Sequence, residues 1–252
     1  MADNLIQWPK AKYWDKAWNP IIGCRPVSPA CDNCYARAMS WRFHKSFAPT
    51  PTTKANPPRK GVVFCGNMTD LFGEWTKGTQ MPEILIREAI GKRHTDATYL
   101  WLTKRVWQMC VAVQKAFNSE WRKTRRFYHY FGFTAENQEW YDKRMSIARE
   151  SFPEWAKLWI SVEPMLGPID MRIHESCTMP RWVVVGSESG KNRRPCKIEW
   201  VEAIVEQCMA AKVPVFVKQL PINNRCETDI NKFPAHLRIR QVPWANEQEI
   251  VK

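Results

Sequence analysis

Apolar runs of strand length alternate with helical patterns along most of this chain, and this alternation restricts the folds open to it. Near-continuous apolar strands separated by helices are typical of a parallel sheet covered by helices. With a first short strand over Trp18–Gly23, the pattern predicts an α/β fold of about six to seven parallel strands, a partial or complete TIM-like (β/α) barrel. The later strands are expected at Val62–Cys65, Tyr99–Leu102, Tyr128–Phe133, Leu158–Val162, Trp182–Val185 and Val213–Val217, and the helices at Pro82–Lys92, Val106–Phe117, Gln138–Ser151 and Trp200–Lys212.

The 252 residues suffice for one large domain or two small ones, and no linker divides them in an obvious way. We therefore expect a lead-in over residues 1–16, a barrel domain over 17–220 and a C-terminal extension over 221–252. Residues 48–60 contain four prolines and are expected to form an exposed loop. No apolar stretch reaches the roughly 18 residues of a membrane span. The first residues also lack an apolar signal region, so we expect no membrane association and a cytoplasmic location.

Polar residues follow the expected strands at the points where these strands end. They are Asn67, Asp70, Thr103, Lys104, Glu136, Asn137, Glu163, Ser187, Glu188, Lys218 and Gln219. In a barrel of parallel strands the carboxyl ends meet at one rim, and such folds carry their sites there. The sequence therefore predicts a polar cavity above an apolar barrel.

Three cysteines lie within eleven residues directly after the first expected strand. Cys24, Cys31 and Cys34 have the spacing C-x6-C-x2-C. Prolines between the first two indicate a loop, and the residues from Asp32 onward favour a helix, with Asp32 as a possible N-cap. We expect the thiolate form to be favoured there, because orphan N–H groups and the helix dipole stabilise negative charge.

The residues leave three interpretations of these thiols open. The first is a disulfide or a set of buried thiols. The second is a zinc site completed by His44 or a distant cysteine, because a closed zinc site needs four ligands. The third is a 4Fe–4S cluster with three protein ligands, which leaves one iron open for a substrate or cofactor. Such an open iron is what radical S-adenosylmethionine chemistry uses.

The net charge of +13 and the pI near 9.4 indicate a polyanionic partner, and nucleic acid is the first candidate. One basic group, Lys191, Arg193, Arg194 and Lys197, follows a strand and is expected near the site. A second group precedes a strand and is expected away from it: Arg122, Lys123, Arg125 and Arg126. No P-loop, G-x-G-x-x-G or G-x-S-x-G motif is present, which argues against an NTPase, a dinucleotide enzyme and a serine hydrolase.

The strings WNPIIGC, SPACDNCYA, VFCGNMTDLFGEW, LTKR, TAENQ, SVEPMLGPID, WVVVGSESGKNRRP and VPVFVKQ occur in this order. The ensemble resembles the phage-type three-Cys-motif proteins, a radical-SAM-like family from bacteriophage genomes. The resemblance implies a partial β/α barrel of the radical SAM type, a 4Fe–4S cluster on Cys24, Cys31 and Cys34, and S-adenosylmethionine as cofactor. It also implies an external electron donor.

Under this resemblance we expect a radical SAM enzyme (an isomerase, lyase or transferase) that acts on a nucleic acid or nucleotide, with phage DNA thymine hypermodification as one option. The alternative is a zinc- or iron–sulfur-stabilised nucleic-acid-binding protein without catalysis. The residues expected to hold the cofactor are Tyr35, Asn67, Asp70, Thr103, Lys104 and Glu163. Those expected to hold the substrate are Glu136, Asn137, Ser187, Glu188, Arg193, Arg194, Lys218 and Gln219.

Overall fold

The computed structural model describes residues 6–53, 56–91, 96–118, 128–173 and 179–244. The chain divides into two compact units, each built from more than one segment. The cysteine-loop unit comprises Trp14–Phe133 and Ser146–Lys157. The C-terminal unit comprises Met1–Tyr13, Thr134–Met145 and Leu158–Lys252. Each unit is described on its own below.

Parallel strands form the centre of the cysteine-loop unit. Their order is β2-β5-β6-β7, with β2 at Lys16–Trp18, β5 at Lys60–Cys65, β6 at Asp96–Thr103 and β7 at His129–Thr134. All neighbouring pairs are parallel, with Val63 opposite Tyr99 and Tyr99 opposite His129. A short antiparallel pair, β3 (Ile21–Ile22) with β4 (Thr50–Pro51), lies outside this sheet.

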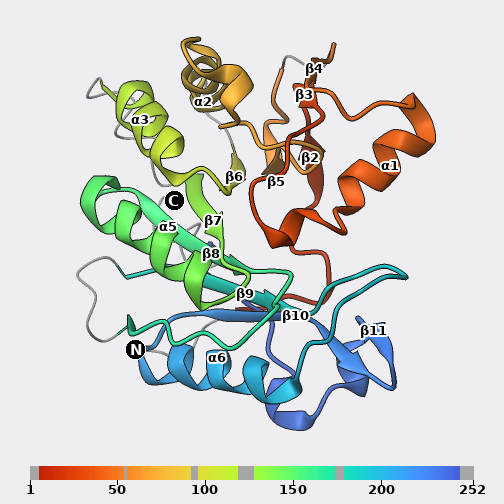
Figure 1. The fold of residues 1–252 in the computed structure, drawn as a ribbon. Helices are drawn as coiled ribbons and strands as arrows, with labels where there is room; N and C mark the ends of the chain where they lie inside the picture. The colour runs from red at the N-terminus through yellow and green to blue at the C-terminus, as the bar shows by residue number, and fades with distance from the viewer. Residues whose placement is uncertain (1–5, 54–55, 92–95, 119–127, 174–178, 245–252) are drawn as a thin grey trace. The chain divides into compact units, whose positions relative to one another are not determined.

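Helices connect these strands (Figure 1). They are α1 at Tyr35–His44, α2 at Met81–Ile90 and α3 at Val106–Ala116, and α2 packs against α3. The buried residues of α2 and α3 recur at helical spacing, so each helix turns one apolar stripe inward. Pro82 is accepted near the start of α2, because the first helical N–H groups have no partner within the helix.

The C-terminal unit also has a parallel centre, formed by β8 (Lys157–Val162), β9 (Trp182–Gly186) and β10 (Val215–Ile222). Helix α6 (Ile198–Ala210) packs on β9 and β10, and α5 (Gln138–Ser151) precedes β8. β10 continues through a tight turn into antiparallel β11 (Arg225–Glu227). Asn223 and Asn224 both have positive φ in this turn, which Asn tolerates better than most residues.

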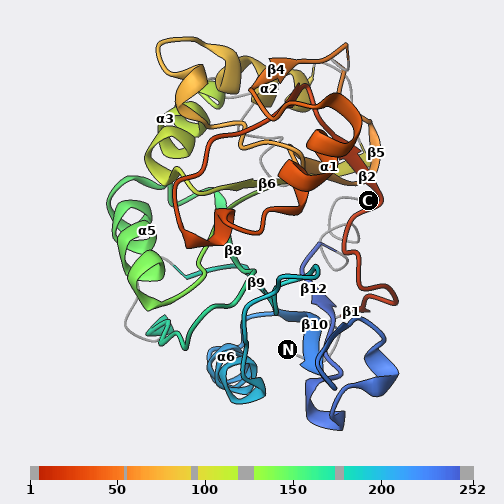
Figure 2. The same cartoon turned by 45° about the vertical axis from the view of Figure 1, so that its right-hand side comes forward.

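The end of the described chain pairs with its beginning inside the C-terminal unit. β12 (Gln241–Val242) is antiparallel to β1 (Ile6–Gln7) and lies beside β10 (Figure 2). The indole N–H of Trp182 donates to the Gln241 carbonyl at 2.8 Å, and the Trp244 ring packs edge-on against Trp182. The extension whose role the sequence left open is therefore an integral part of this unit.

The mixed α/β class and the alternation of parallel strands with helices are confirmed. All six later strands and all four helices form within a few residues of their expected bounds. In both units consecutive parallel strands are neighbours, which is the connectivity of a barrel wall. The first expected strand is different, because β2 ends at Trp18, Ile21–Ile22 pair with β4, and Gly23 forms an isolated parallel bridge with Thr69. Among the described residues no helix has both the length and the apolarity needed to cross a membrane.

Acid sensitivity is expected to come from His129, which is buried in β7. Burial, together with the charge of Lys157, lowers the pKa of His129 from 6.5 to about 3. Between these values the unfolded chain binds a proton that the native chain does not, so stability should fall as pH drops below about 6.5. We expect urea unfolding to show this loss between about pH 7 and pH 5, and His129→Asn to flatten it. Parallel pH profiles for the two proteins would contradict this assignment.

Candidate functional site

The cysteine loop, residues 23–34, is attached to the segment that follows β5. The Gly23 N–H donates to the Met68 carbonyl at 3.1 Å, and the Thr69 hydroxyl donates to the Gly23 carbonyl at 2.5 Å. Gly23 has φ of +99°, and a Cβ there would lie 2.2 Å from the Ala48 carbonyl oxygen. Only glycine therefore fits where the chain enters this loop.

A buried carboxylate connects this loop to the end of β6. Asp70 is 6% exposed and accepts hydrogen bonds from the Thr103 hydroxyl at 2.7 Å, the Lys104 N–H at 3.0 Å and the Arg105 guanidinium at 3.0 Å. Arg105 also donates to the Arg25 carbonyl in the cysteine loop at 3.0 Å. Both partners are nearly buried, so the ion pair is held in a place of low dielectric.

Asn67 and Tyr35 form a second attachment. The Tyr35 hydroxyl donates to the Asn67 carbonyl at 2.6 Å, while the Asn67 amide oxygen accepts from the Asn19 side chain at 2.7 Å. Asn19 in turn accepts from the Met68 N–H at 3.1 Å. The start of α1 is thus fixed against the loop after β5, with the Tyr35 ring 49% exposed.

The three loop cysteines are free thiols of intermediate burial, so the disulfide interpretation is wrong for this structure. Burial and, to a lesser extent, the Asp70 charge raise the pKa of Cys24 to about 11, even though Arg105 and Lys104 lower it. The expectation of a favoured thiolate is therefore wrong for free Cys24, because burial outweighs the two cations. Asp32 is not the N-cap of α1; Cys34 occupies that position, and Asp32 ends the short 3-10 helix Pro29–Cys31.

No three His, Cys, Asp or Glu side chains are grouped as metal ligands within the described ranges. His44 lies at the exposed C-terminal end of α1, about 15 Å along the helix from Cys34. The structure therefore gives no support to His44 as the fourth ligand of a zinc site with all three cysteines. Of the remaining cysteines, Cys65, Cys110 and Cys208 are buried, and Cys177 lies outside the described residues.

A polar cluster lies at the carboxyl ends of β8 and β9 and beside the middle of β10, because β10 continues to Ile222 past Lys218 and Gln219, which the sequence placed after the strand. Lys218 is 2.9 Å from a Glu163 carboxylate oxygen, and the Tyr13 hydroxyl lies 3.5 Å from the other oxygen. The register of β10 shifts at Lys218, a local irregularity of the kind that redirects a side chain beside a site. Gly186 leaves room for Glu163, because a Cβ there would be only 3.1 Å from its carboxylate.

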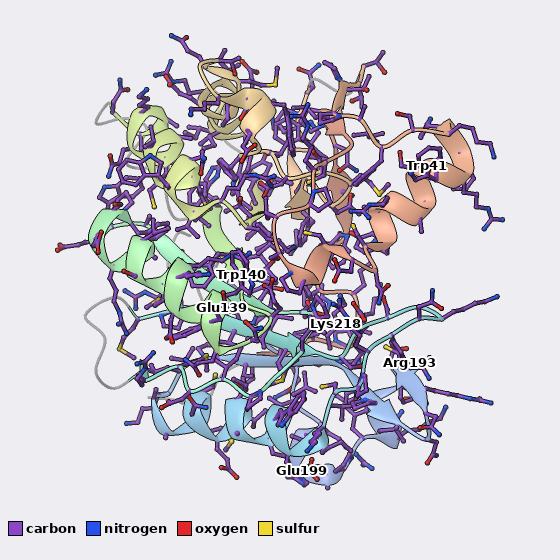
Figure 3. The ribbon with its side chains drawn as sticks, in the orientation of Figure 1. Trp41, Glu139, Trp140, Arg193, Glu199 and Lys218 are labelled. Carbon is purple, nitrogen blue, oxygen red and sulfur yellow. The ribbon has the colours of Figure 1, made fainter. Side chains whose placement is uncertain are left out.

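Glu188 and Arg194 form an ion pair and hydrogen bonds with each other within the loop after β9. The Glu188 carboxylate accepts from the Arg194 backbone N–H at 2.8 Å and from the Arg194 Nε at 3.0 Å. By contrast, Arg193 is of intermediate burial and donates to the Gly190 carbonyl at 3.3 Å (Figure 3). Of the two arginines expected to contact phosphate, only Arg194 is held by the Glu188 carboxylate in the described part of the chain.

Ser187 and Gln219 fix β9 to β10 beside this loop. The Gln219 amide donates to the Ser187 carbonyl at 2.5 Å, and the Ser187 N–H donates to the Gln219 carbonyl at 3.2 Å. The Ser187 hydroxyl also lies 3.8 Å from the Cys226 sulfur. Ser187 and Gln219 therefore join β9 to β10 through one main-chain bond and one bond from the Gln219 side chain.

Glu136 and Asn137 serve the structure around α5. Glu136 is fully buried and forms an ion pair with Arg144 at 2.5 Å, and the Asn137 side chain accepts from the Trp140 N–H at 3.1 Å. Both expected substrate residues thus have structural partners. The basic residues Arg122, Lys123, Arg125 and Arg126 lie outside the described residues.

The expected site residues fall into two groups, one in each unit. In the cysteine-loop unit, hydrogen bonds join Tyr35 to Asn67 and join Asp70 to Thr103 and Lys104, and Cys24 lies close enough to Asp70 to feel its charge. Cys31 and Cys34 lie on the same loop, but the three cysteines do not form a metal-ligand group among the described residues. The C-terminal unit brings together Glu163, Ser187, Glu188, Arg193, Arg194, Lys218 and Gln219. Sequence reasoning did not assign Arg105, Tyr13 or Arg144 to a site. Of these three, only Arg105 could have been identified from the sequence as a site residue, since it ends the string LTKR after an expected strand.

A family model described as "Protein of unknown function (DUF5131)" matches residues 9–229 of the chain. Neither the curated proteins nor the solved structures that were compared include a match.

Proposed function

The chain belongs to the DUF5131 family, and we propose that this member is a radical S-adenosylmethionine enzyme that modifies a nucleic-acid base or a nucleotide, on a partial β/α barrel of the radical SAM type. One observation carries the proposal. Three free, half-buried thiols lie on one loop, and that loop is attached to the carboxyl ends of two neighbouring parallel strands, β5 and β6. Sites of β/α folds lie at such ends.

The donor set fits an iron–sulfur cluster in kind. Three cysteine thiols suit a cluster that leaves one iron open. Burial raises the pKa of free Cys24, so bound iron, rather than the surroundings, would have to favour its thiolate. Cys24, Cys31 and Cys34 would hold the cluster. When bound, it supplies the electron that cleaves S-adenosylmethionine reductively, and the hydrogen abstraction from the substrate follows from that cleavage.

The other candidate residues of the cysteine-loop unit would position the cysteine loop and bind the cofactor. Asp70 is saturated by its own chain, so its role is to hold Arg105 and, through it, the cysteine loop. Asn67 and Tyr35 present polar and aromatic surface beside the loop, which suits the amino-acid part and the adenine of the cofactor. The Thr103 hydroxyl and the Lys104 N–H donate the other two hydrogen bonds to the Asp70 carboxylate.

The C-terminal unit supplies the groups proposed to bind the substrate. Lys218 is 23% exposed at the Glu163 ion pair and can donate to a polar substrate group, while Glu163 accepts. Arg193 offers a partly exposed guanidinium for phosphate. The excess of positive charge over the whole chain supports a polyanionic substrate.

The experiment is anaerobic purification followed by metal analysis and incubation with S-adenosylmethionine and a strong one-electron reductant. We expect a brown protein with about four iron atoms per chain, and 5′-deoxyadenosine that forms only when the reductant is present. A colourless protein that binds one zinc and leaves S-adenosylmethionine intact would overturn the proposal. That outcome would favour the alternative, a metal-stabilised nucleic-acid-binding protein.

A further inference from the structure

Helix α1 exposes an unusual run of large side chains directly after the third cysteine. Trp41 is 54% exposed and Phe43 is 67% exposed, with Arg42 exposed between them. Because consecutive helical residues project about 100° apart, the three side chains fan out across the outer side of α1. Figure 3 labels Trp41 on this helix. Aromatic side chains of this size are normally buried, so their exposure needs a reason.

The charge of α1 shows what kind of partner fits these rings. The helix contains Arg37, Arg42 and His44, it ends at Lys45, and it has no acidic residue. The Arg42 guanidinium lies 5.6 Å from the centre of the Phe43 ring, so cation and aromatic face lie together. A surface of rings and cations is complementary to a chain that alternates bases with phosphates.

The surface beside this helix is also hollowed. A cavity of about 340 Å³ borders α1 and the following loop, and its walls mix apolar and hydroxyl side chains. The hydroxyls of Ser40, Thr50 and Thr52 already donate to main-chain carbonyls. The exposed side chains of α1, rather than this hollow, are therefore what a partner can contact.

We infer that Trp41, Arg42 and Phe43 form a stacking platform for single-stranded nucleic acid, with bases on the two rings and a phosphate on Arg42. The inference rests on the proposed function, since it names the substrate class of the same protein. Duplex DNA is disfavoured, because its base faces are stacked on each other and unavailable to a protruding ring. Phe43 lies about 14 Å along the helix from Cys34, so the platform is on the helix that leads out of the cysteine loop.

The test is fluorescence anisotropy with a labelled oligothymidylate, on the full chain. Stacking is worth about 1–3 kcal/mol per base, so Trp41→Ala and Phe43→Ala should each weaken binding by about tenfold. Arg42→Gln should reduce the slope of log affinity against log salt by about 0.7, the value for one phosphate of a single strand. A labelled oligouridylate should bind in the same way if DNA and RNA share the platform.

The chain offers matched controls on other helices of the same unit. Trp107 on α3 is 56% exposed, and Arg149 on α5 is exposed. Trp107→Ala and Arg149→Gln should leave affinity and salt slope unchanged. Losses of affinity from these controls as large as those from Trp41→Ala and Phe43→Ala would overturn the platform. Equal affinity for single-stranded and duplex DNA would also overturn it. So would complete displacement of the oligonucleotide by heparin combined with no effect of Trp41→Ala on its affinity.

The binding assay separates this inference from the proposed function. A protein without iron that still binds oligothymidylate through Trp41 and Phe43 would overturn the proposed function and leave the platform intact. A protein that cleaves S-adenosylmethionine but does not bind single strands would overturn only the platform. Thermal unfolding of each variant shows whether it is folded.

Discussion

Replacing Cys24, Cys31 or Cys34 with serine is expected to lower the iron content from about four atoms per chain to a trace. Each serine removes one of only three thiolate ligands, and a hydroxyl is a poor ligand for a cluster. The loss should also remove the visible absorbance and the reductive cleavage of S-adenosylmethionine. Iron and sulfide analysis of anaerobically reconstituted protein measures the first effect directly.

Buried cysteines elsewhere supply the controls. Cys110 in α3 and Cys208 in α6 face apolar surroundings, and burial raises the pKa of the Cys110 thiol to about 12. Cys110→Ser and Cys208→Ser should therefore keep full iron content. Replacing Cys65 or Cys196 with serine should also leave the iron content unchanged, although the sequence places both near strand ends. Loss of iron on replacing either would contradict the three-ligand assignment.

Asp70→Asn is expected to reduce the free energy of unfolding by about 3–5 kcal/mol, because it leaves the Arg105 guanidinium buried beside a neutral group. The same change loosens the bond between Arg105 and the Arg25 carbonyl, so iron loading should fall as well. Urea unfolding of the metal-free protein measures the stability effect separately from metal binding.

An exposed ion pair provides the matched control for this substitution. Asp142 pairs with Arg172 at the surface, and both side chains are more than a third exposed. Asp142→Asn should cost at most about 1 kcal/mol. If the two substitutions cost the same, the Asp70 network does not stabilise the fold as argued. Combining Asp70→Asn with Arg105→Met should cost less than the sum of the single changes, since both charges are then absent.

Element type could be predicted from this sequence because local pattern decides it. The runs around Val62, Tyr99 and Val183 are apolar throughout, as strands covered on both faces must be, and Gln138–Ser151 matches α5 to the residue. The start of α1 was predicted less well. Asp32 is a good N-cap by residue type, but the short 3-10 helix at Pro29–Cys31 uses it, so the longer helix begins after Cys34.

The parts that sequence could not predict depend on contacts between distant residues. No local sequence pattern shows that the Asp70 carboxylate accepts hydrogen bonds from Thr103, Lys104 and Arg105. From the sequence alone, the same carboxylate is equally suited to bind a cofactor. Likewise, Glu136 follows a strand end yet is buried against Arg144. Position at a strand end identifies a candidate, whereas the partners decide whether it faces a ligand or the core.

The pairing of β1 with β12 has a consequence for how this protein is made. Ile6 pairs with Val242, so the contact closes a loop of almost the whole chain for only two residue pairs. Closing so long a loop is entropically costly until most of the chain is already folded. On the ribosome, Ile6 emerges well before Val242 and lacks this partner until Val242 has left the exit tunnel. β1 is therefore made before all the other described strands of its unit and is among the last to be paired.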